Sequence, residues 1–327
     1  MNILSSQTTM QAKQKLFIYI PTYSRPKCLQ NQLDSLVPQV KAFPDRVRLI
    51  VRDNDSPGFD LSTFEEQYIA ANITFSRNIG NIGANANISL GFIFSNLDEF
   101  LWILSDNDLV QFGCVEYLLG KLDSSCDFIV LNNFNLHPKT IPWIWESNLL
   151  LPITLGQGLI SATLFNTNSI RNSIENAYFF HNSSFPHLAV AIATAKEKGK
   201  VFYLQLPIGK VLKLELDSSE SSGNYSLSYV GMPLLLSLFS LSAARAFARD
   251  WAEHRAYLLF QHAYAYPELA ISSEFNILKY GGFIVHLYML KGRCLALGLL
   301  IYSSLRRNFK CIADNNLFKF IKPTRFL

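Results

Sequence analysis

The sequence predicts an α/β protein with a mixed, mainly parallel sheet flanked by helices, followed by a helical C-terminal region. In the first two thirds of the chain, short apolar runs rich in strand-forming residues alternate with segments whose apolar residues recur at helical spacing. The connections are short, which favours parallel strands with helices on both faces of a sheet. Hydrophobic residues make up 49% of the 327 residues and charged residues 17%, a composition that supports a large core and excludes a disordered chain.

The first apolar run, Leu16–Ile20, is expected to be a buried strand, and Pro26 to lie in the first turn of the helix that follows. The other expected strands are Val47–Val51, Ile73–Phe75, Phe100–Leu104, Asp127–Leu131, Leu159–Phe165 and Val201–Leu206. The other expected helices are Thr63–Ala70, Asn81–Asn96, Ser183–Lys198, Met232–Trp251 and Gly281–Ser304. Polar clusters follow several strands directly, at the place where open α/β sheets bind ligands.

Charge is divided unevenly along the chain. Residues 228–327 hold 12 Lys and Arg against 5 Asp and Glu, a net of +7, and residues 1–227 hold 17 against 20, a net of −3, which together give +4. This change, with the loop-like composition of residues 217–224, predicts a domain boundary between residues 225 and 226. Residues 1–15 are expected to form a flexible N-terminal extension.

The cysteines and the N-terminus predict a cytoplasmic location. Five cysteines are an odd number, and no two form a Cys-x-x-Cys pair, which argues against a disulfide framework or a zinc site and fits a reducing compartment. The first 15 residues have no apolar core of the kind found in signal peptides.

Asp106 and Asp108 form an Asp-x-Asp cluster directly after the strand expected at Phe100–Leu104. Two carboxylates at a strand end can both face Mg²⁺ or Mn²⁺, hard ions that prefer oxygen ligands and bridge to substrate phosphates. The alternative is a polar loop or a helix N-cap, where Asp is also favoured.

Asp53 stands in a second polar cluster, Val51–Ser56, at the end of another expected strand. Its carboxylate could accept hydrogen bonds from a base or from a ribose. The alternative is a turn closed by Pro57 and Gly58, in which the Asp side chain bonds to its own backbone.

Thr22, Tyr23 and Arg25 follow the first expected strand. Thr22 and Tyr23 could hold a nucleotide, and Arg25 could pair with a phosphate. The alternative is an ordinary turn from a strand into a helix.

Arg77 and Asn81 belong to a fourth cluster that extends to Asn87 and includes Gly80 and Gly83. Glycines permit close backbone approach, and the N-terminus of a helix favours anions. The alternative is a plain pair of helix caps. The cluster is neither a dinucleotide fingerprint nor a P-loop, because it lacks both glycine patterns.

In this order and spacing, the four clusters resemble the family 2 glycosyltransferases. That family reads Pro-Thr-Tyr-Asn-Arg near its start, then Val-x-Asp-Asn-x-Ser, then Asn-x-Gly-x-x-x-x-Asn, and then an Asp-x-Asp motif after a hydrophobic strand. The matching stretches are Pro21–Arg25, Val51–Ser56, Asn81–Asn87 and Asp106–Asp108. The resemblance covers residues 15–135 well and extends more loosely to about residue 215.

The resemblance implies a GT-A-type fold, with a catalytic domain at 16–225 and a helical, basic region at 226–327. Within the catalytic domain, residues 16–135 would form the donor half and 136–225 the acceptor half. Thr22, Tyr23 and Asp53 would contact the nucleoside of the donor, and Asp106 its ribose or sugar. The expected donor-binding residues are Thr22, Tyr23, Arg25, Asp53, Arg77, Asn81 and Asp106. The expected ligands of Mn²⁺ or Mg²⁺ are Asp108 and Asp106.

The general base is expected at His187. The family places a Glu-Asp pair near the start of a helix here, but this chain reads Ser183-Ser184-Phe185-Pro186-His187. A similar Pro-His occurs in the abequosyltransferase-like branch of the family, which builds bacterial O-antigens. His187 could act as a base, since its ordinary pKa is ~6.5. It could also bind a metal or phosphate, or be a helix-start histidine bonded to the backbone, and a retaining enzyme needs no such base.

The basic C-terminal region, 226–327, is expected either to contact a membrane surface peripherally or to pack as a helical cap or a dimer interface. Its apolar runs are too short or too interrupted by charge to span a bilayer, whereas Lys, Arg and aromatic residues suit an interfacial anchor at the inner face of the plasma membrane. Nucleic acid is not an expected partner, because the basic residues interleave with apolar runs.

These features together predict a metal-assisted glycosyltransferase. It would move a sugar from a nucleoside-diphosphate donor to a hydroxyl of a polysaccharide or a lipid-linked oligosaccharide. One alternative is a sugar nucleotidyltransferase, although the Gly-rich, Lys-containing loop expected after its first strand is missing. The other is a non-catalytic subunit that binds the donor within a polysaccharide assembly complex.

Overall fold

The computed structural model describes residues 14–70, 72–132, 160–181, 185–198 and 201–213, together with scattered positions between 235 and 294. The chain divides into two compact units. One comprises Met1–Glu220 with Leu234–Ser240, and the other comprises Ser221–Pro233 with Leu241–Leu327. The helices expected at Met232–Trp251 and Gly281–Ser304 lie largely outside the described residues, and the positions described within them are mostly helical.

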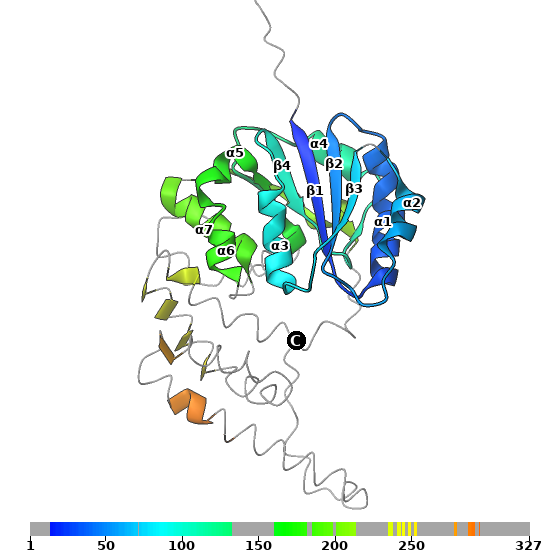
Figure 1. Ribbon diagram of the computed structural model, residues 1–327. Helices are drawn as coiled ribbons and strands as arrows, with labels where there is room; N and C mark the ends of the chain where they lie inside the picture. The colour runs from blue at the N-terminus through cyan, green and yellow to red at the C-terminus, as the bar shows by residue number, and fades with distance from the viewer. Residues whose placement is uncertain are drawn as a thin grey trace, which may run out of the picture. The chain divides into compact units, whose positions relative to one another are not determined.

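A seven-stranded mixed sheet forms the centre of the first unit, in the order β3-β2-β1-β4-β7-β6-β8. Figure 1 shows β3, β2, β1 and β4 side by side. Its strands are β1 (Lys15–Thr22), β2 (Val47–Asp53), β3 (Ile73–Arg77), β4 (Glu99–Ile103), β6 (Phe128–Asn132), β7 (Thr163–Asn166) and β8 (Tyr203–Pro207). Only β7 runs antiparallel to its neighbours in this sheet. The predicted fold class, a mixed and mainly parallel sheet flanked by helices, is confirmed.

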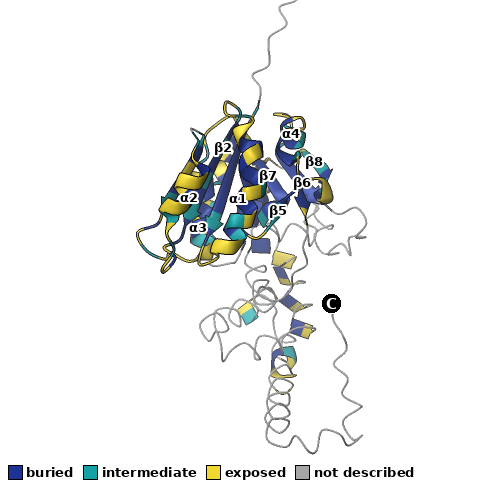
Figure 2. Ribbon diagram, turned by 90° about the vertical axis from the view of Figure 1, so that its right-hand side faces the viewer, coloured by how far each residue is buried: buried dark blue, intermediate teal, exposed yellow. Residues whose placement is uncertain are grey.

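Helices cover both faces of this sheet. They are α1 (Pro26–Lys41), α2 (Leu61–Tyr68), α3 (Ala84–Ile93), α4 (Cys114–Leu119), α5 (Thr167–Ile170), α6 (Asn176–Phe179) and α7 (Pro186–Lys198). On one face, Leu16, Ile18 and Ile20 of β1 pack with the apolar residues of α1 in a single core cluster. On the other face, Tyr19 contacts α3, which also contacts α6 and α7. Figure 2 shows the strands buried between the half-exposed helices.

Helix α1 begins at Pro26, as predicted, because the fixed φ of proline suits a first helical turn, where its missing N–H is not needed. Four of its buried residues, Leu29, Leu33, Leu36 and Val40, recur three or four positions apart and face the sheet. The same spacing predicted this helix from the sequence, so its position after β1 follows from its apolar pattern.

Two predicted elements differ from the structure. The strand expected at Leu159–Phe165 begins with a 3₁₀ turn, Ile160–Ala162, and is extended only in β7. The helix expected from Asn81 begins at Ala84, because Gly83 has a φ of 85°, which interrupts helical geometry. A two-stranded sheet of β5 (Leu109–Val110) and β9 (Leu212–Lys213) was not predicted, because two residues carry no periodicity.

Gly91 allows α3 to approach β1 closely. A Cβ at position 91 would lie 2.8 Å from Cδ1 of Tyr19 and 3.3 Å from Cγ1 of Ile103. Tyr19 is fully buried, and its hydroxyl donates a hydrogen bond of 2.9 Å to the backbone oxygen of Asn87, one turn before Gly91. The small residue therefore sets how α3 is seated against the sheet.

We expect Gly91→Ala to destabilise the protein by about 1–3 kcal/mol, because an added methyl group in a filled core forces its neighbours to move. In an open helix the same change would stabilise by about 1 kcal/mol. Gly120→Ala is the control, since its Cβ would meet only backbone oxygens at 3.5 and 3.6 Å. Urea unfolding of both variants measures the effect, and a stabilised Gly91→Ala protein would contradict this account of the packing.

Candidate functional site

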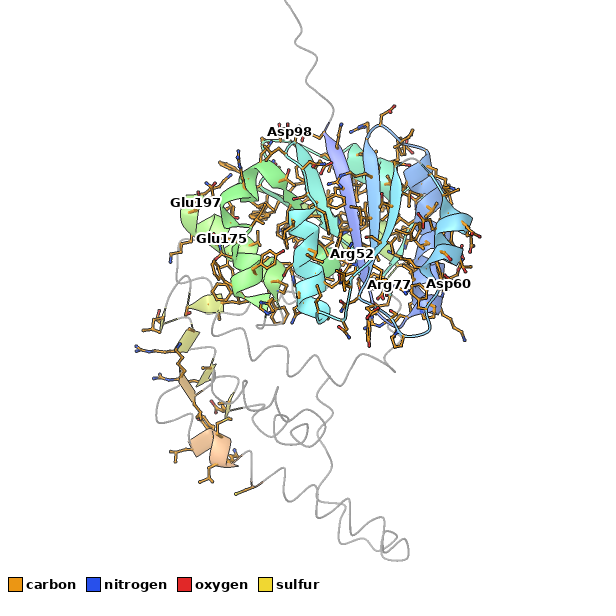
Figure 3. All side chains as sticks on the ribbon, in the orientation of Figure 1. Arg52, Asp60, Arg77, Asp98, Glu175 and Glu197 are labelled. Carbon is orange, nitrogen blue, oxygen red and sulfur yellow. The ribbon has the colours of Figure 1, made fainter. Side chains whose placement is uncertain are left out.

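Three predicted site residues meet at one end of the sheet, which we call the carboxyl end because β1, β2, β3 and β4 all finish there. Thr22, the last residue of β1, pairs in parallel register with Asp53, the last residue of β2. Asp106 follows three residues after β4, which pairs with β1 on its other side. Figure 3 shows Arg77 at this end and Asp98, just before β4, at the opposite end.

A cavity of about 200 Å³ opens at the carboxyl end of the sheet. Four predicted site residues line it: Thr22, Tyr23, Arg25 and Asp106. Its other lining residues are Pro21, Asn54, Ala84, Asn87, Ile88, Ser105 and Ile160. The cavity thus combines a carboxylate, a guanidinium and hydroxyl groups with an apolar wall, which is a typical composition for a small-molecule site.

Asp106 is the central charged group of this cavity, and it is only 3% exposed. One carboxylate oxygen accepts a hydrogen bond of 2.7 Å from the Thr22 hydroxyl, and the other accepts one of 3.0 Å from the Arg25 guanidinium. Burial raises the pKa of Asp106, and the charge of Arg25 opposes that rise. The site therefore holds a carboxylate whose charged form is poorly solvated.

Asp108 lies beside it but faces a different partner. Its Oδ2 accepts a hydrogen bond of 2.6 Å from Ser161, whose Oγ accepts one of 2.8 Å from the backbone N–H of Ser105. Burial raises the pKa of Asp108, the Ser161 hydrogen bond opposes the rise, and Asp106 adds to it. Sequence reasoning missed Ser161, because it belongs to a segment far from the motif in the chain.

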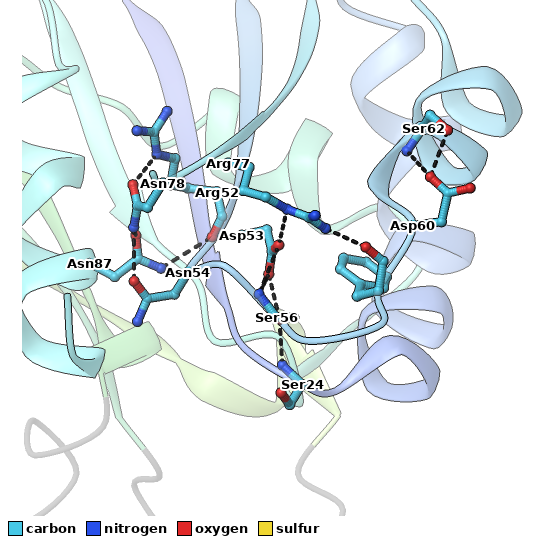
Figure 4. A network of polar contacts seen from close by, with 11 residues as sticks. Ser24, Arg52, Asp53, Asn54, Ser56, Asp60, Ser62, Arg77, Asn78 and Asn87 are labelled. Atoms are coloured by element: carbon cyan, nitrogen blue, oxygen red, sulfur yellow. Dashed lines mark hydrogen bonds and ion pairs between the residues drawn. The ribbon is translucent and has the colours of Figure 1, made fainter. Parts of the chain in front are cut away.

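Asp53 and Arg77, both predicted to bind the donor, bind each other (Figure 4). The carboxylate of Asp53 is fully buried and accepts hydrogen bonds from Arg77 Nε at 2.6 Å and from the backbone N–H and hydroxyl of Ser56. A turn stabilised by the Asp side chain, the alternative considered from the sequence, is therefore present here. Neither Asp53 nor Arg77 lines the cavity.

Four asparagines form a network at the cavity, partly drawn in Figure 4, and two of them, Asn54 and Asn87, line it. Asn78 donates to Asn54 at 2.9 Å and to Asn87 at 3.1 Å, and Asn54 donates to Asn81 at 2.7 Å. The Oδ1 of Asn81 also accepts from the backbone N–H of Gly83 at 2.9 Å, just before α3. Asn81 therefore fixes the start of α3 and does not line the cavity. The roles of Asn54 and Asn78 were not predicted from the sequence.

His187 lies in the first turn of α7, at the carboxyl end of the sheet. Lys198, the last residue of α7, forms an ion pair with Asp127, which directly precedes β6. Because β6 runs in the same direction as β4, the end of α7 lies where these strands begin. The helix is about 20 Å long, enough to cross the sheet, and it runs toward the opposite end (Figure 1).

The His187 side chain is only 2% exposed and lies edge-on to Phe185, with 6.1 Å between the ring centroids. It does not line the cavity that Asp106 and Arg25 share. Its assignment as a base stays a prediction. Its burial at a helix start is equally compatible with the alternative considered from the sequence, a helix-start histidine bonded to the backbone.

The family model for glycosyl transferase family 2 matches residues 17–185, more than half of the chain. The chain therefore belongs to glycosyl transferase family 2, and the resemblance seen in the four sequence clusters is confirmed. Comparison with curated protein sequences found no match.

Solved structures with a similar fold include S. aureus TarS 1-349 in complex with UDP-GlcNAc, at a TM-score of 0.52 and 13% identity over 90% of this chain and 92% of that one. The mannosyltransferase PcManGT from Pyrobaculum calidifontis, in complex with GDP-Man and Mn²⁺, has a TM-score of 0.48 at 12% identity, covering 94% and 88%. A longer S. aureus TarS chain aligns with a TM-score of 0.48 and 12% identity over 86% of this chain. The present chain spans 54% of that longer one.

Within the described residues, no helix combines the length and the apolar character needed to cross a membrane.

We expect Asp53→Asn to destabilise the protein by about 1–3 kcal/mol, because Arg77 and Ser56 lose a charged acceptor at a fully buried position. The matched control is Asp60→Asn, at the exposed N-cap of α2, where Asn serves as well as Asp. Urea unfolding compares the two variants. Equal stabilities would show that the buried pair contributes nothing to the fold.

Proposed function

We propose that this chain transfers a sugar from a nucleoside-diphosphate donor to a hydroxyl group of a polysaccharide or lipid-linked oligosaccharide, assisted by a divalent metal ion. The observation that carries the proposal is Asp106, a buried carboxylate held by Thr22 and Arg25 in a cavity at the carboxyl end of the sheet. Membership of glycosyl transferase family 2 supplies the reaction class.

The described residues fit a divalent ion whose coordination shell is completed by the phosphates of the substrate. Among them, no group of three or more His, Cys, Asp or Glu side chains could enclose a metal ion. Asp106 and Asp108 are two carboxylates with raised pKa values, and a nearby cation would relieve the unfavourable burial of both charges. Mg²⁺ and Mn²⁺ sites of this type use one or two carboxylates together with substrate phosphates.

Each side chain has a role that follows from its place. Tyr23, a cavity residue that is 41% exposed, would stack on or border the nucleoside, and Thr22 would orient Asp106. Arg25 would neutralise part of the negative charge of the diphosphate that leaves. The metal ion, when bound, supplies further positive charge to the same leaving group.

Asp53, Arg77 and Asn81 do not line the cavity, and they would support the elements that do. Asp53 and Arg77 fix the ends of β2 and β3, and Asn81 fixes the start of α3. As donor-site residues, these three would act by holding the strand ends and the helix start in place. Direct contact of Asp53 with the nucleoside requires neighbouring groups to move, because the carboxylate is fully buried.

His187 would serve as the base that takes the proton of the acceptor hydroxyl. Its position in the first turn of α7 puts it at the carboxyl end of the sheet, as that role requires. Because its side chain is 2% exposed, the acceptor would have to displace neighbouring groups to reach it. A retaining reaction, in which no such base is needed, is the alternative that stereochemical analysis of the product would reveal.

The acceptor and the location complete the proposal. The net charge of +7 on residues 228–327 favours an anionic surface, as found at the inner face of the plasma membrane, where lipid-linked oligosaccharides are extended. A bacterial surface polysaccharide such as an O-antigen is the acceptor class that we propose.

A panel of nucleoside diphosphates and their sugars, read by thermal shift with and without Mn²⁺, tests the proposal. We expect one base to stabilise the protein in a metal-dependent manner, by ~2.7 kcal/mol at a hundredfold excess over its dissociation constant. Asp108→Asn should abolish the metal-dependent part. Asp98→Asn is the control, because Asp98 lies at the opposite end of the sheet and its φ of 64° suits Asn equally.

No shift with any nucleotide, on folded protein, would contradict the transferase proposal. Binding of the donor without turnover on any acceptor would instead favour a non-catalytic, donor-binding subunit.

We expect Mn²⁺ affinity to fall as the pH falls, starting above the ordinary carboxyl pKa of 3.8, because a protonated carboxyl is a poor ligand and both pKa values are raised. Calorimetry at about pH 5 and about pH 7, in buffers of different ionisation enthalpy, measures the affinity and the protons released. Asp108→Asn should release fewer protons. An affinity that does not change with pH would contradict carboxylate ligation.

The same raised pKa values act on folding with the opposite sign. In the metal-free protein, the folded state holds these protons more tightly than the unfolded chain. The stability that Asp106 and Asp108 contribute is therefore present at low pH and lost as the pH rises above the ordinary value of 3.8.

A further inference from the structure

Two arginine–aspartate pairs lie at the carboxyl end of the sheet, and they differ in access. In the pair of Arg77 and Asp53, the carboxylate is fully buried, also accepts hydrogen bonds from Ser56, and lies outside the cavity. In the pair of Arg25 and Asp106, both side chains line the cavity, and the Arg25 side chain is 50% exposed. Only the second pair can therefore exchange partners with a ligand that enters this cavity.

The turn between β1 and α1 holds Arg25 in this position. Ser24 has a φ of 53°, an uncommon conformation for a residue with a side chain, and its backbone N–H donates to Ser56 Oγ at 2.7 Å. Arg25 is the N-cap residue of α1, and its guanidinium, which has only donors, bonds to Asp106 across the turn. The backbone is fixed on both sides of Arg25, while its long side chain retains freedom to move.

We propose that Arg25 is an internal counter-cation, which pairs with Asp106 in the empty site and competes with the divalent ion for that carboxylate. On release, the guanidinium becomes available to the diphosphate of the donor. Metal and nucleotide would then bind in a coupled manner, since each favours the state in which Arg25 has left Asp106. This inference rests on the proposed function.

The strength of the pair suits such an exchange. Only the guanidinium side of the pair is exposed, so water can solvate Arg25 after it leaves, and the incoming divalent ion would replace its charge beside the buried carboxylate. Arg25 makes one hydrogen bond to Asp106, so little is lost when it moves. Thr22 keeps its own hydrogen bond to the other carboxylate oxygen, which holds Asp106 in place during the exchange.

Titration of the nucleotide-free full chain with MnCl₂, followed by electron paramagnetic resonance of free Mn²⁺, tests the competition. Arg25→Gln should bind Mn²⁺ about fivefold more tightly than the wild type, the factor expected from removal of a half-exposed ion pair. With Mn²⁺ saturating, the same variant should bind UDP or GDP, whichever the wild type binds, about fivefold more weakly.

Lys27→Gln is the matched control, because Lys27 is an exposed cation two residues away in the first turn of α1. It removes the same charge without touching Asp106, so its Mn²⁺ affinity should stay close to that of the wild type. An equal gain in Lys27→Gln would show that general electrostatics suffices, and would overturn the proposal.

Suppose that the wild type binds Mn²⁺ and nucleotide, and that Arg25→Gln binds Mn²⁺ no more tightly. This result would overturn the proposal that Arg25 is a counter-cation and leave the proposed function intact. If neither protein bound Mn²⁺ or nucleotide, both proposals would fail together.

Discussion

The parallel pairing of β1 with β2 on one side and β4 on the other is the constraint on which the site depends. It places Thr22 beside Asp53 in register, and it brings Tyr19 opposite Ile103, three residues before Asp106. A slip of one residue would turn every side chain of β1 to the wrong face. Because Leu16–Ile20 are fully buried on both faces of β1, side-chain shape and the buried hydrogen bond from the Tyr19 hydroxyl to the backbone oxygen of Asn87 oppose such a slip. The geometry of the cavity is thus fixed by apolar residues that do not touch it.

The second constraint is the cost of burying polar groups at the carboxyl end. Asp53, Asn54, Asn78, Asn87 and Asp106 are each no more than 6% exposed. Buried polar groups without partners are costly, and these side chains supply hydrogen bonds to one another and to the backbone. Satisfied networks of this kind rigidify a site before ligand arrives. Asparagine suits them because its amide both donates and accepts.

The sequence predicted the strands and the location of the site because both depend on local pattern. Apolar runs marked β1, β2 and β4, and polar clusters marked their ends. It did not predict that β7 runs antiparallel, since direction in a sheet is decided by the connection and by tertiary packing. It also did not predict the partners of the acidic residues. Ser161 meets Asp108 across 53 positions of chain, and no local pattern encodes that contact.

The two acidic motifs at the carboxyl end of the sheet, Asp53 and the pair of Asp106 and Asp108, differ in how their negative charge is balanced. Asp53 is matched by Arg77, so that pair is electrically neutral and closed by hydrogen bonds. Asp106 and Asp108 together carry two negative charges when ionised, against which the described residues set the one charge of Arg25 and the neutral hydroxyls of Thr22 and Ser161. Burial raises the pKa of both carboxyl groups, and the one charge of Arg25 only opposes that rise at Asp106. In the exchange that we propose, the guanidinium would turn to a diphosphate, and a divalent ion would then balance the two carboxylates.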